Sequence, residues 1–531
     1  MNSATRRALP AAAALLLFLA CGAALLWPAL FGHQILWAGG YFVRLGPFPA
    51  ELQARAPAGI APLSDSVQCF VPWLRFAADG LRADGSLPLW KDTAGAGAPL
   101  LGNGQSALFF PTNLLAILLG APPIVHALSA LLKFAGGAFC AWLLARHLRL
   151  SFIASVLCGL VFGFGGFQAA WNLFPLTNVS LLLPLLVLAV DRLAARPSAA
   201  GVALLAGVAG LQHLGGHPET AFHCQVAALA LGCARSLSLR AEIGGGPALR
   251  RIGWIAAGLC LGLLLAAIQV LPLLEYVAHS ELLLRRAGYV APPLHPVAGL
   301  GFGLGVLCAV LALRHLARSE RGSLLAALML GGSMFGGLLA GLAAGMQPTF
   351  VMSLLPDWFG GPDRFIGPGY YVSHAGAFAG AAFPLAVLGV MAGQPRGLAK
   401  AAGVVAGVGL LAGFGVPLLT DVLHRLPVFD VALNDRLQLL CLLATAVLAA
   451  FGLDALPSLR AAGARRRLLW AVLMPVLGAF AALACSVPLE LVSSSNLPAR
   501  AHPALVEAQL LPAAKVAPIF ADEPPLEDPG S

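Results

Sequence analysis

Charged residues are scarce in this 531-residue sequence. Asp, Glu, Lys and Arg together make up 10% of it, whereas hydrophobic residues make up 59% and the mean hydropathy is +0.85. This balance excludes an ordinary soluble globular protein, in which charged residues are far more frequent. The sequence therefore predicts an integral membrane protein.

Several chemical signatures are missing as well. The ten cysteines include no CxxC pair and nearly all lie in apolar runs, which argues against a zinc site or a disulfide framework. Cys69 is the one clear loop cysteine. No GxxxxGK[ST] loop is present, so ATP use is not indicated. There is also no convincing short-period repeat.

Apolar runs are what the sequence has in abundance. A spanning helix needs about 20 mostly apolar residues, and about thirteen runs of that kind recur along the chain. The fold class expected is an all-α polytopic membrane protein with a long first extracytoplasmic loop. The predicted spans are 8–31, 123–145, 151–170, 174–192, 199–214, 219–234, 252–274, 297–316, 323–346, 373–393, 399–418, 436–456 and 468–488.

Basic residues fall in alternate loops, as the positive-inside rule requires of the cytoplasmic side. The net charge of +9 is mostly this signal, and it gives little support to nucleic-acid binding. We expect a bacterial inner membrane protein with a cytoplasmic N-terminus and an extracytoplasmic C-terminus. Four parts are predicted: an uncleaved first anchor at 1–31, an extracytoplasmic loop with an interfacial helix at 32–122, a multi-span domain at 123–488, and a short, flexible, Pro-rich and acidic tail at 489–531.

Polar residues on the non-cytoplasmic side are the candidates for function, because charge near a bilayer is costly unless it is paired or used. They cluster in the first loop and in four later ones. In the second of these clusters, Gly215 and Gly216 favour a hairpin with capping polar residues over a metal or proton-transfer site. The candidates are Asp65, Gln68, Asn103, Gln105, His217, Glu219, Glu275, Arg364 and Arg425.

Seven short motifs, read in order, resemble the YfhO-like bacterial membrane proteins of the glycosyltransferase-C superfamily. The first-loop set is the most specific part. The motifs are D-x-x-Q-x-x-x-P at 65–72, G-x-x-P-x-W at 85–90, G-x-P at 97–99, Q-x-x-x-F-x-P at 105–111, W-N-x-x-P at 171–175, G-H-P-E-T at 216–220 and A-x-Q-x-L-P-x-x-E at 267–275.

That resemblance implies an enzyme that takes a sugar from a polyprenyl-phosphate carrier and passes it to an envelope glycopolymer or glycolipid outside the cytoplasm. It implies a catalytic acidic residue in the first loop, and Asp65 is the matching position. Asp65 would be the general base, while Arg364, Arg425 and His217 are candidates to balance the departing phosphate. A divalent cation is left open as a cofactor.

Two departures from the family pattern stand out. Ser64 and Ser66 flank Asp65, so a carboxylate pair is absent from the motif, and longer relatives carry an extracytoplasmic domain where this sequence has a short tail. Two other classes stay open: a transporter or flippase of lipid-linked sugars, and a non-catalytic scaffold for envelope assembly. Charges at the ends of spans and apolar middles of most spans favour catalysis at the outer surface over transport.

Overall fold

The computed structural model describes residues 3–32, 34–36, 49–51, 65–93, 97–281, 352, 375–380, 382–415, 417–460 and 496–498. The spans predicted at 297–316, 323–346 and 468–488 lie outside these residues, and so does Arg364. The helices of the N-terminal part are α1 (Ser3–Leu25), α2 (Trp27–Leu30), η2 (Ser66–Phe70), α5 (Val71–Asp84), α6 (Pro111–Leu118), α7 (Pro123–His147), α8 (Phe152–Gly163), α9 (Gly166–Ala170), α10 (Pro175–Ser180) and α11 (Leu183–Ala195).

The later helices are α12 (Ala199–Leu214), α13 (Pro218–Ser238), α14 (Arg240–Ile243), α15 (Gly245–Leu265), α16 (Ala267–Ala278), η4 (Ala375–Ala377), α21 (Ala382–Ala392), α22 (Arg396–Gly413), α23 (Pro417–Leu423), η5 (Asn434–Leu437) and α24 (Gln438–Arg460). Two small antiparallel sheets pair β1 (Gln34–Leu36) with β4 (Asn496–Pro498) and β2 (Trp90–Lys91) with β3 (Ala98–Pro99). β4 is the described part of the predicted tail.

Proline and short polar side chains mark where several of these helices begin. Pro111, Pro123, Pro175 and Pro218 are the first residues of their helices, a position that suits proline because the first-turn N–H has no intrahelical partner. Ser151 caps α8 by accepting a hydrogen bond from the Ala154 N–H. These local signals explain why α7, α12 and α13 begin within one residue of the apolar runs predicted at 123–145, 199–214 and 219–234.

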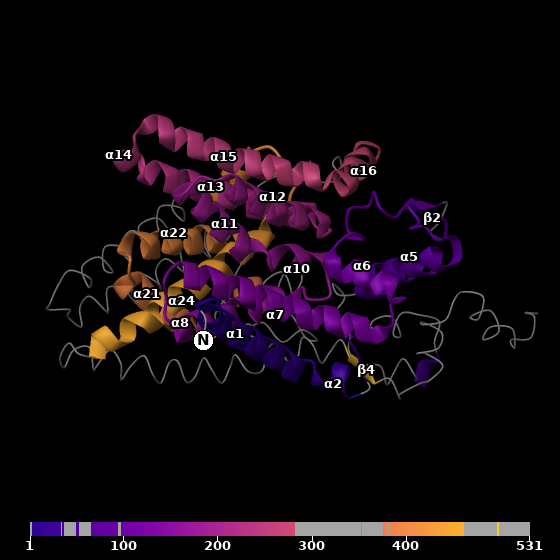
Figure 1. Ribbon diagram of the computed structural model, residues 1–531. Helices are drawn as coiled ribbons and strands as arrows, with labels where there is room; N and C mark the ends of the chain where they lie inside the picture. The colour runs from indigo at the N-terminus through magenta and orange to yellow at the C-terminus, as the bar shows by residue number, and fades with distance from the viewer. Residues whose placement is uncertain are drawn as a thin grey trace, which may run out of the picture.

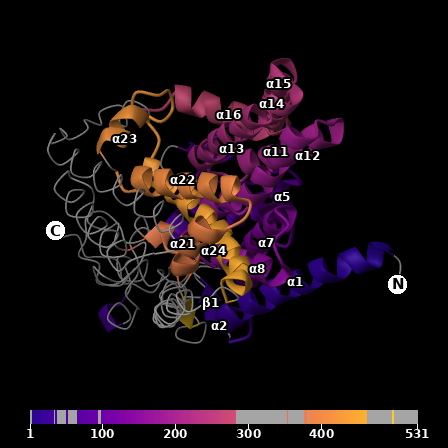
Figure 2. The ribbon, with the colours of Figure 1, turned by 90° about the vertical axis from the view of Figure 1, so that its left-hand side faces the viewer.

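The long helices lie side by side in layers, from α15 through α12 and α13, then α11 and α7, to α1 (Figures 1 and 2). α11 is central, and its Leu183, Leu186 and Leu193 side chains are fully buried. On another side, α24 packs against α8, α21 and α22. α21 and α24 cross so closely that a Cβ on Gly389 or on Gly452 would strike the facing backbone, so only glycine fits there.

One end of the layered helices is held together by polar contacts among basic and acidic residues. Asp191 at the end of α11 contacts His147 of α7 at 2.7 Å and Arg235 of α13 at 3.3 Å. Ser151 donates from its backbone N–H to Asp454 of α24 at 2.8 Å. The C-terminal parts of α7, α11, α13 and α24, which the charge pattern assigns to the cytoplasmic side, therefore lie at the same end of the layered helices.

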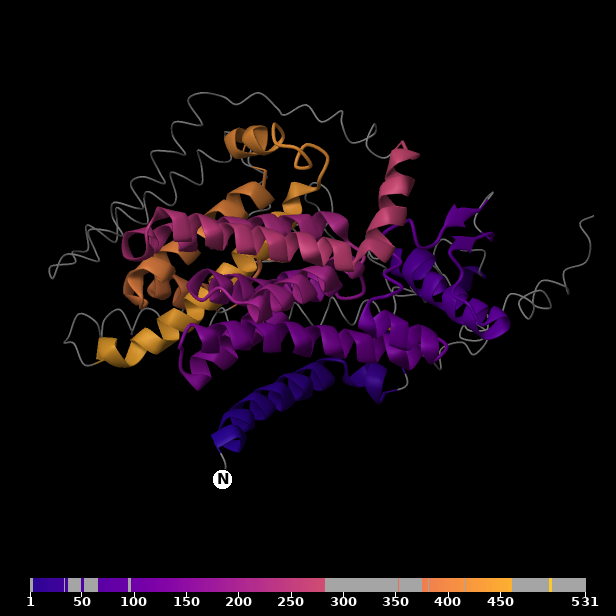
Figure 3. The same cartoon turned by 45° about the horizontal axis from the view of Figure 1, so that its top comes forward.

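The first loop folds into a small unit at the opposite end of the helices, built from α5, α6 and the β2–β3 hairpin (Figure 1). Its own apolar cluster contains Leu74, Leu100, Leu108 and Ile117. α16 turns sharply away from α15 at Ala266 and runs beside this unit (Figure 3). The run predicted as one span at 252–274 is thus two helices, with only α15 long enough to cross a bilayer.

Within the part of the chain that the structure describes, five helical stretches are long and apolar enough to cross a membrane: Pro123–His147, Phe152–Ala170, Pro175–Ala195, Gly245–Leu265 and Asn434–Pro457. α15 also exposes large apolar side chains, among them Leu249 at 66% and Leu264 at 69%. An exposed apolar face of this kind is suited to contact with lipid. The protein is a helical membrane protein, and the full count of thirteen spans remains a prediction.

Candidate functional site

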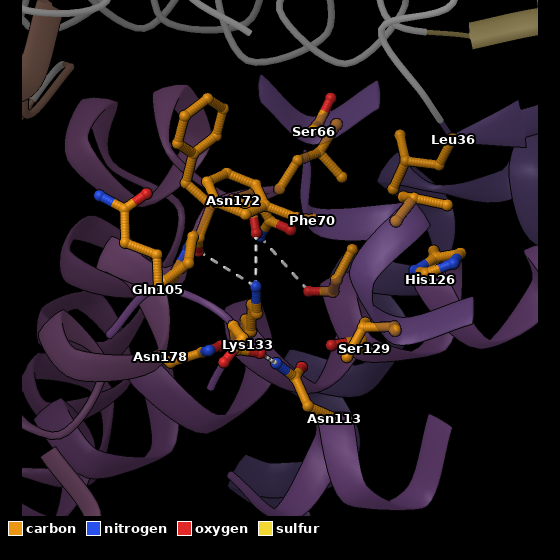
Figure 4. A pocket seen from close by; sticks show the side chains of 17 residues that line it. Leu36, Ser66, Phe70, Gln105, Asn113, His126, Ser129, Lys133, Asn172 and Asn178 are labelled. Carbon is orange, nitrogen blue, oxygen red and sulfur yellow. Dashed lines mark hydrogen bonds between the residues drawn. The ribbon is translucent and has the colours of Figure 1, made fainter. Parts of the chain in front are cut away.

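A cavity lies where the first-loop unit meets α7 and α10 (Figure 4). Its walls bring together three of the sequence motifs, from residues 65–72, 105–111 and 171–175, which are far apart along the chain. The lining side chains with polar groups are Ser66, Gln105, Ser106, Asn113, His126, Ser129, Lys133, Asn172 and Asn178. The cavity is therefore polar although it borders apolar helices.

The wall from the first loop is shaped by Asn103. Its Oδ1 accepts hydrogen bonds from the backbone N–H groups of Gln105 at 2.8 Å and Ser106 at 2.9 Å, and its Nδ2 donates to the Pro99 carbonyl at 3.2 Å. Asparagine commonly closes turns in this way, by bonding its own nearby backbone. Asn103 thus positions Gln105 and Ser106 at the cavity without lining it.

Aromatic rings support the same wall from behind. Phe70, which lines the cavity, packs edge-on against Phe174 with ring centroids 4.9 Å apart and against Trp73 at 5.7 Å. Phe174 in turn packs against Trp171, and the Arg436 guanidinium lies 4.3 Å from the centre of the Trp171 ring. This chain of contacts fixes the 171–175 motif between the first loop and the start of α24.

Among the described residues, Lys133 is the only lysine or arginine that lines the cavity, and it lies inside α7. Its side chain is only 7% exposed, and its Nζ donates to the backbone carbonyls of Asn172 at 2.8 Å and Phe174 at 3.3 Å. It stands ten residues into the helix, about 15 Å along the axis at 1.5 Å per residue. The sequence interpretation that charges lie at the ends of spans is wrong for this residue, because a single lysine is hidden in the average hydropathy of a long apolar run.

Asp65 stands immediately before Ser66, at the N-terminal end of the π-helical turn η2, and it is exposed. Partial burial of its carboxyl group raises the pKa of Asp65 above 3.8, its ordinary value. Burial also raises the pKa of the Cys69 thiol; the nearby Asp65 carboxylate raises it further and Lys91 lowers it. Asp65 is thus beside the cavity and open to solvent, but is not one of its lining residues.

The other predicted site residues of the described part fall in several places. Gln105 lines the cavity, whereas Gln68, Glu275 and Arg425 are exposed away from its lining. His217 is the N-cap of α13, where its Nδ1 accepts from the Thr220 backbone N–H at 3.2 Å. Glu219 accepts from the Leu433 backbone N–H at 3.2 Å.

His213 and His217 serve different neighbours, since His213 contacts Gln225 and His217 contacts Thr220. Across the described residues, no three His, Cys, Asp or Glu side chains gather in a way that could hold a metal ion. The predicted hairpin with a capping histidine is what the structure places at Gly215 and Gly216.

Sequence reasoning missed Lys133, His126, Ser129 and Asn178. For Lys133 a signal existed, because an ionisable residue within an apolar span is by itself a pointer to function. Asn178 gave no comparable signal. Its place in the cavity depends on how α10 packs against the turn at Gly215, which apolar periodicity does not report.

No family model matches the chain, and no curated protein has a matching sequence. Among solved structures, the chain is similar to the oligosaccharyltransferase AglB of the archaeon Archaeoglobus fulgidus, in complex with an inhibitory peptide and a dolichol-phosphate. The identity is 13% and the TM-score is 0.37, over 90% of this chain and 55% of that one. The chain thus spans about half the length of AglB, and a likeness this weak establishes neither a shared fold nor a shared activity.

Proposed function

We propose that this protein is a membrane glycosyltransferase that moves a sugar from a polyprenyl-phosphate carrier to an envelope glycopolymer or glycolipid outside the cytoplasm. The observation that carries the proposal is the meeting of three motifs of the sequence resemblance around one polar cavity beside Asp65.

The chemistry assigns Asp65 as the general base. Its carboxylate takes the proton of an acceptor hydroxyl, the freed oxygen forms a bond to the anomeric carbon of the sugar, and the bond between that carbon and the carrier phosphate oxygen breaks. A base must come within about 2.6–3.2 Å of the hydroxyl it deprotonates. The exposure of Asp65 supports this role, because an acceptor arriving from the aqueous side can reach it.

The decisive experiment compares purified wild-type protein with Asp65→Asn, which keeps the size of the side chain but removes the base. Both receive a polyprenyl-phosphate sugar and a panel of envelope acceptors. Asp84→Asn is the matched control, because Asp84 is an exposed carboxylate in the same first-loop unit and outside the cavity lining. We expect transfer from wild type and Asp84→Asn and a loss of at least a hundredfold from Asp65→Asn. Equal transfer by Asp65→Asn would remove Asp65 from the mechanism.

A flippase of lipid-linked sugars is the second candidate, and two observations favour it. Lys133 lies deep in a spanning helix, and the stretch from α8 to α11 is interrupted at residues 164–165, 171–174 and 181–182. Transporters often carry broken helices and charged groups at such depths. In proteoliposomes, a flippase would move a lipid-linked sugar across the bilayer without any acceptor, and Asp65→Asn would not impair it.

A further inference from the structure

The cavity holds a buried cation whose charge is not neutralised nearby. Within the described part of the chain, Lys133 forms no ion pair, and its Nζ contacts two neutral carbonyl groups. An ammonium group needs three hydrogen-bond acceptors, so one N–H is left for a ligand. A buried charge without an opposite charge is costly, and an anion in the cavity would relieve that cost.

Two of the three asparagines that line the cavity, Asn172 and Asn178, present acceptors rather than donors. Asn172 donates from Nδ2 to the Ala130 carbonyl at 3.4 Å, and Asn178 donates from Nδ2 to the Gly215 carbonyl at 3.1 Å. These bonds fix the orientation of each amide, so the Oδ1 atoms are the ones left over. Both Oδ1 atoms are buried without a hydrogen-bond partner, although the residues are 5% and 1% exposed.

Other polar atoms of the cavity wall are unpaired in the same way. The Ser106 Oγ is buried without a partner, and so is the His126 Nε2. Buried polar atoms in native proteins nearly always have a partner, which can be a ligand or an ordered water molecule. A wall with one cation, two amide oxygens and a hydroxyl calls for a ligand that carries both negative charge and several O–H donors.

We infer that this cavity binds the sugar-phosphate head group of the lipid carrier, with the phosphate at Lys133 and the sugar hydroxyls at the amide oxygens of Asn172 and Asn178. The inference rests on the proposed function and deepens it, because it assigns the phosphate to Lys133, a residue that no motif of the sequence includes.

The test measures equilibrium binding to the full-length protein in lipid nanodiscs. Three probes are used: a short-chain polyprenyl-phosphate sugar, the matching polyprenyl glycoside without phosphate, and the free sugar 1-phosphate without lipid. The variant is Lys133→Met, which keeps the length of the side chain and removes its charge. Lys91→Met is the matched control, because Lys91 belongs to the first-loop unit but does not line the cavity.

We expect Lys133→Met to weaken binding of the phosphate-bearing lipid at least tenfold and to leave the weak binding of the neutral glycoside unchanged. Lys91→Met should bind like wild type. If Lys133→Met binds the phosphate-bearing lipid as wild type does, or loses both lipids equally, Lys133 only supports the 171–174 turn and the inference is wrong. If the wild type binds the free sugar 1-phosphate as tightly as the phosphate-bearing lipid, the same contacts are supported, but the ligand that they hold is a water-soluble sugar phosphate.

A second variant protects the test against misfolding of Lys133→Met. Asn172→Asp places a carboxylate in the residue whose carbonyl already contacts Lys133, so it supplies the missing anion within the protein. It should remain folded, although it gives up the hydrogen bond from the Asn172 Nδ2 to the Ala130 carbonyl, and should bind the phosphate-bearing lipid at least tenfold more weakly. Wild-type affinity in a folded Asn172→Asp variant would overturn the inference.

Binding and transfer can fail separately. Asp65→Asn should bind the phosphate-bearing lipid like wild type, because Asp65 lies outside the cavity lining. If the wild type binds this lipid through Lys133 but transfers sugar to no acceptor, the head-group site stands and the proposed glycosyltransferase activity falls. Absence of any binding by the wild type would contradict the head-group site itself.

Discussion

Replacing Gly216 by alanine should destabilise the protein and disturb the cavity at the same time. Gly216 lies between α12 and α13 with φ of +82°, a backbone conformation that side chains with a Cβ rarely adopt. A Cβ here would lie 2.6 Å from the Ala107 Cβ, 3.2 Å from the Gln105 carbonyl oxygen and 3.2 Å from the Pro175 Cβ. One added methyl group would therefore push on both the first loop and the start of α10.

The size of the effect follows from three contributions. The left-handed conformation costs a residue with a Cβ about 1–2 kcal/mol, and overpacking a filled interior costs about 1–3 kcal/mol. The smaller conformational freedom of alanine in the unfolded chain offsets about 0.4–1 kcal/mol. The free energy of unfolding should therefore fall by about 1–5 kcal/mol.

The free energy of unfolding is measured by titrating the purified protein in mixed micelles with SDS. The control is Gly207→Ala in the interior of α12, where an added Cβ meets nothing within 4 Å. That control should gain about 0.5–1 kcal/mol, because alanine is the better helix former. Gly216→Ala should also bind the phosphate-bearing lipid more weakly. If the two alanine variants prove equally stable, the close packing at Gly216 has been misread.

Three further perturbations have defined outcomes. Because burial raises the pKa of Asp65, its base form is lost at higher pH than for a free aspartate, so the acidic limb of the transfer rate should lie above pH 3.8; a pH profile of the rate checks this, and a limb at or below that pH contradicts it. Asp191→Asn replaces the carboxylate that contacts His147 and Arg235 by a neutral amide and should lower the free energy of unfolding by about 1 kcal/mol at these partly exposed positions. An effect that persists when Arg235 is also replaced by Met would show that this ion pair is not its cause. Gln269→Leu removes the donor to the Leu101 carbonyl at 2.8 Å and should cost about 1–3 kcal/mol in the same titration, unless water reaches that carbonyl.

The long helices could be predicted from the sequence because apolar runs and proline act locally. The run predicted at 123–145 is α7 (Pro123–His147), and the one at 199–214 is α12 with the same bounds. The break near 171–173 was predicted from the end of one apolar run and the start of the next, whereas the breaks at 164–165 and 181–182 and the turn at Ala266 were not. They depend on packing against distant segments, such as the hydrogen bond from the Gly166 N–H to the Phe378 carbonyl at 2.8 Å, which a pattern of apolar residues does not contain.

The candidate site was predictable only where its residues belong to a recognisable sequence motif. Gln105 was chosen from such a motif and lines the cavity, and Asn172 belongs to another motif. Lys133 belongs to none of the motifs. Asn178 has no distinguishing sequence context, and only the fold shows that it donates to the Gly215 carbonyl. Whether Asp65 is the base stays a prediction until its variants are assayed.

Four buried polar side chains around the cavity donate hydrogen bonds to the main chain rather than to other side chains. Lys133, Asn178, Gln212 and Gln269 all donate to backbone carbonyls, those of residues 172 and 174, 215, 179 and 101. Every residue type carries a carbonyl, so the accepting positions can change identity without losing these bonds, whereas the donors cannot. During evolution, therefore, the surface that selects a sugar or an acceptor can drift while the donor set that frames it is held fixed. In a saturation mutagenesis map of the protein, the donor positions should tolerate few substitutions and the positions that accept through their backbone carbonyls should tolerate many.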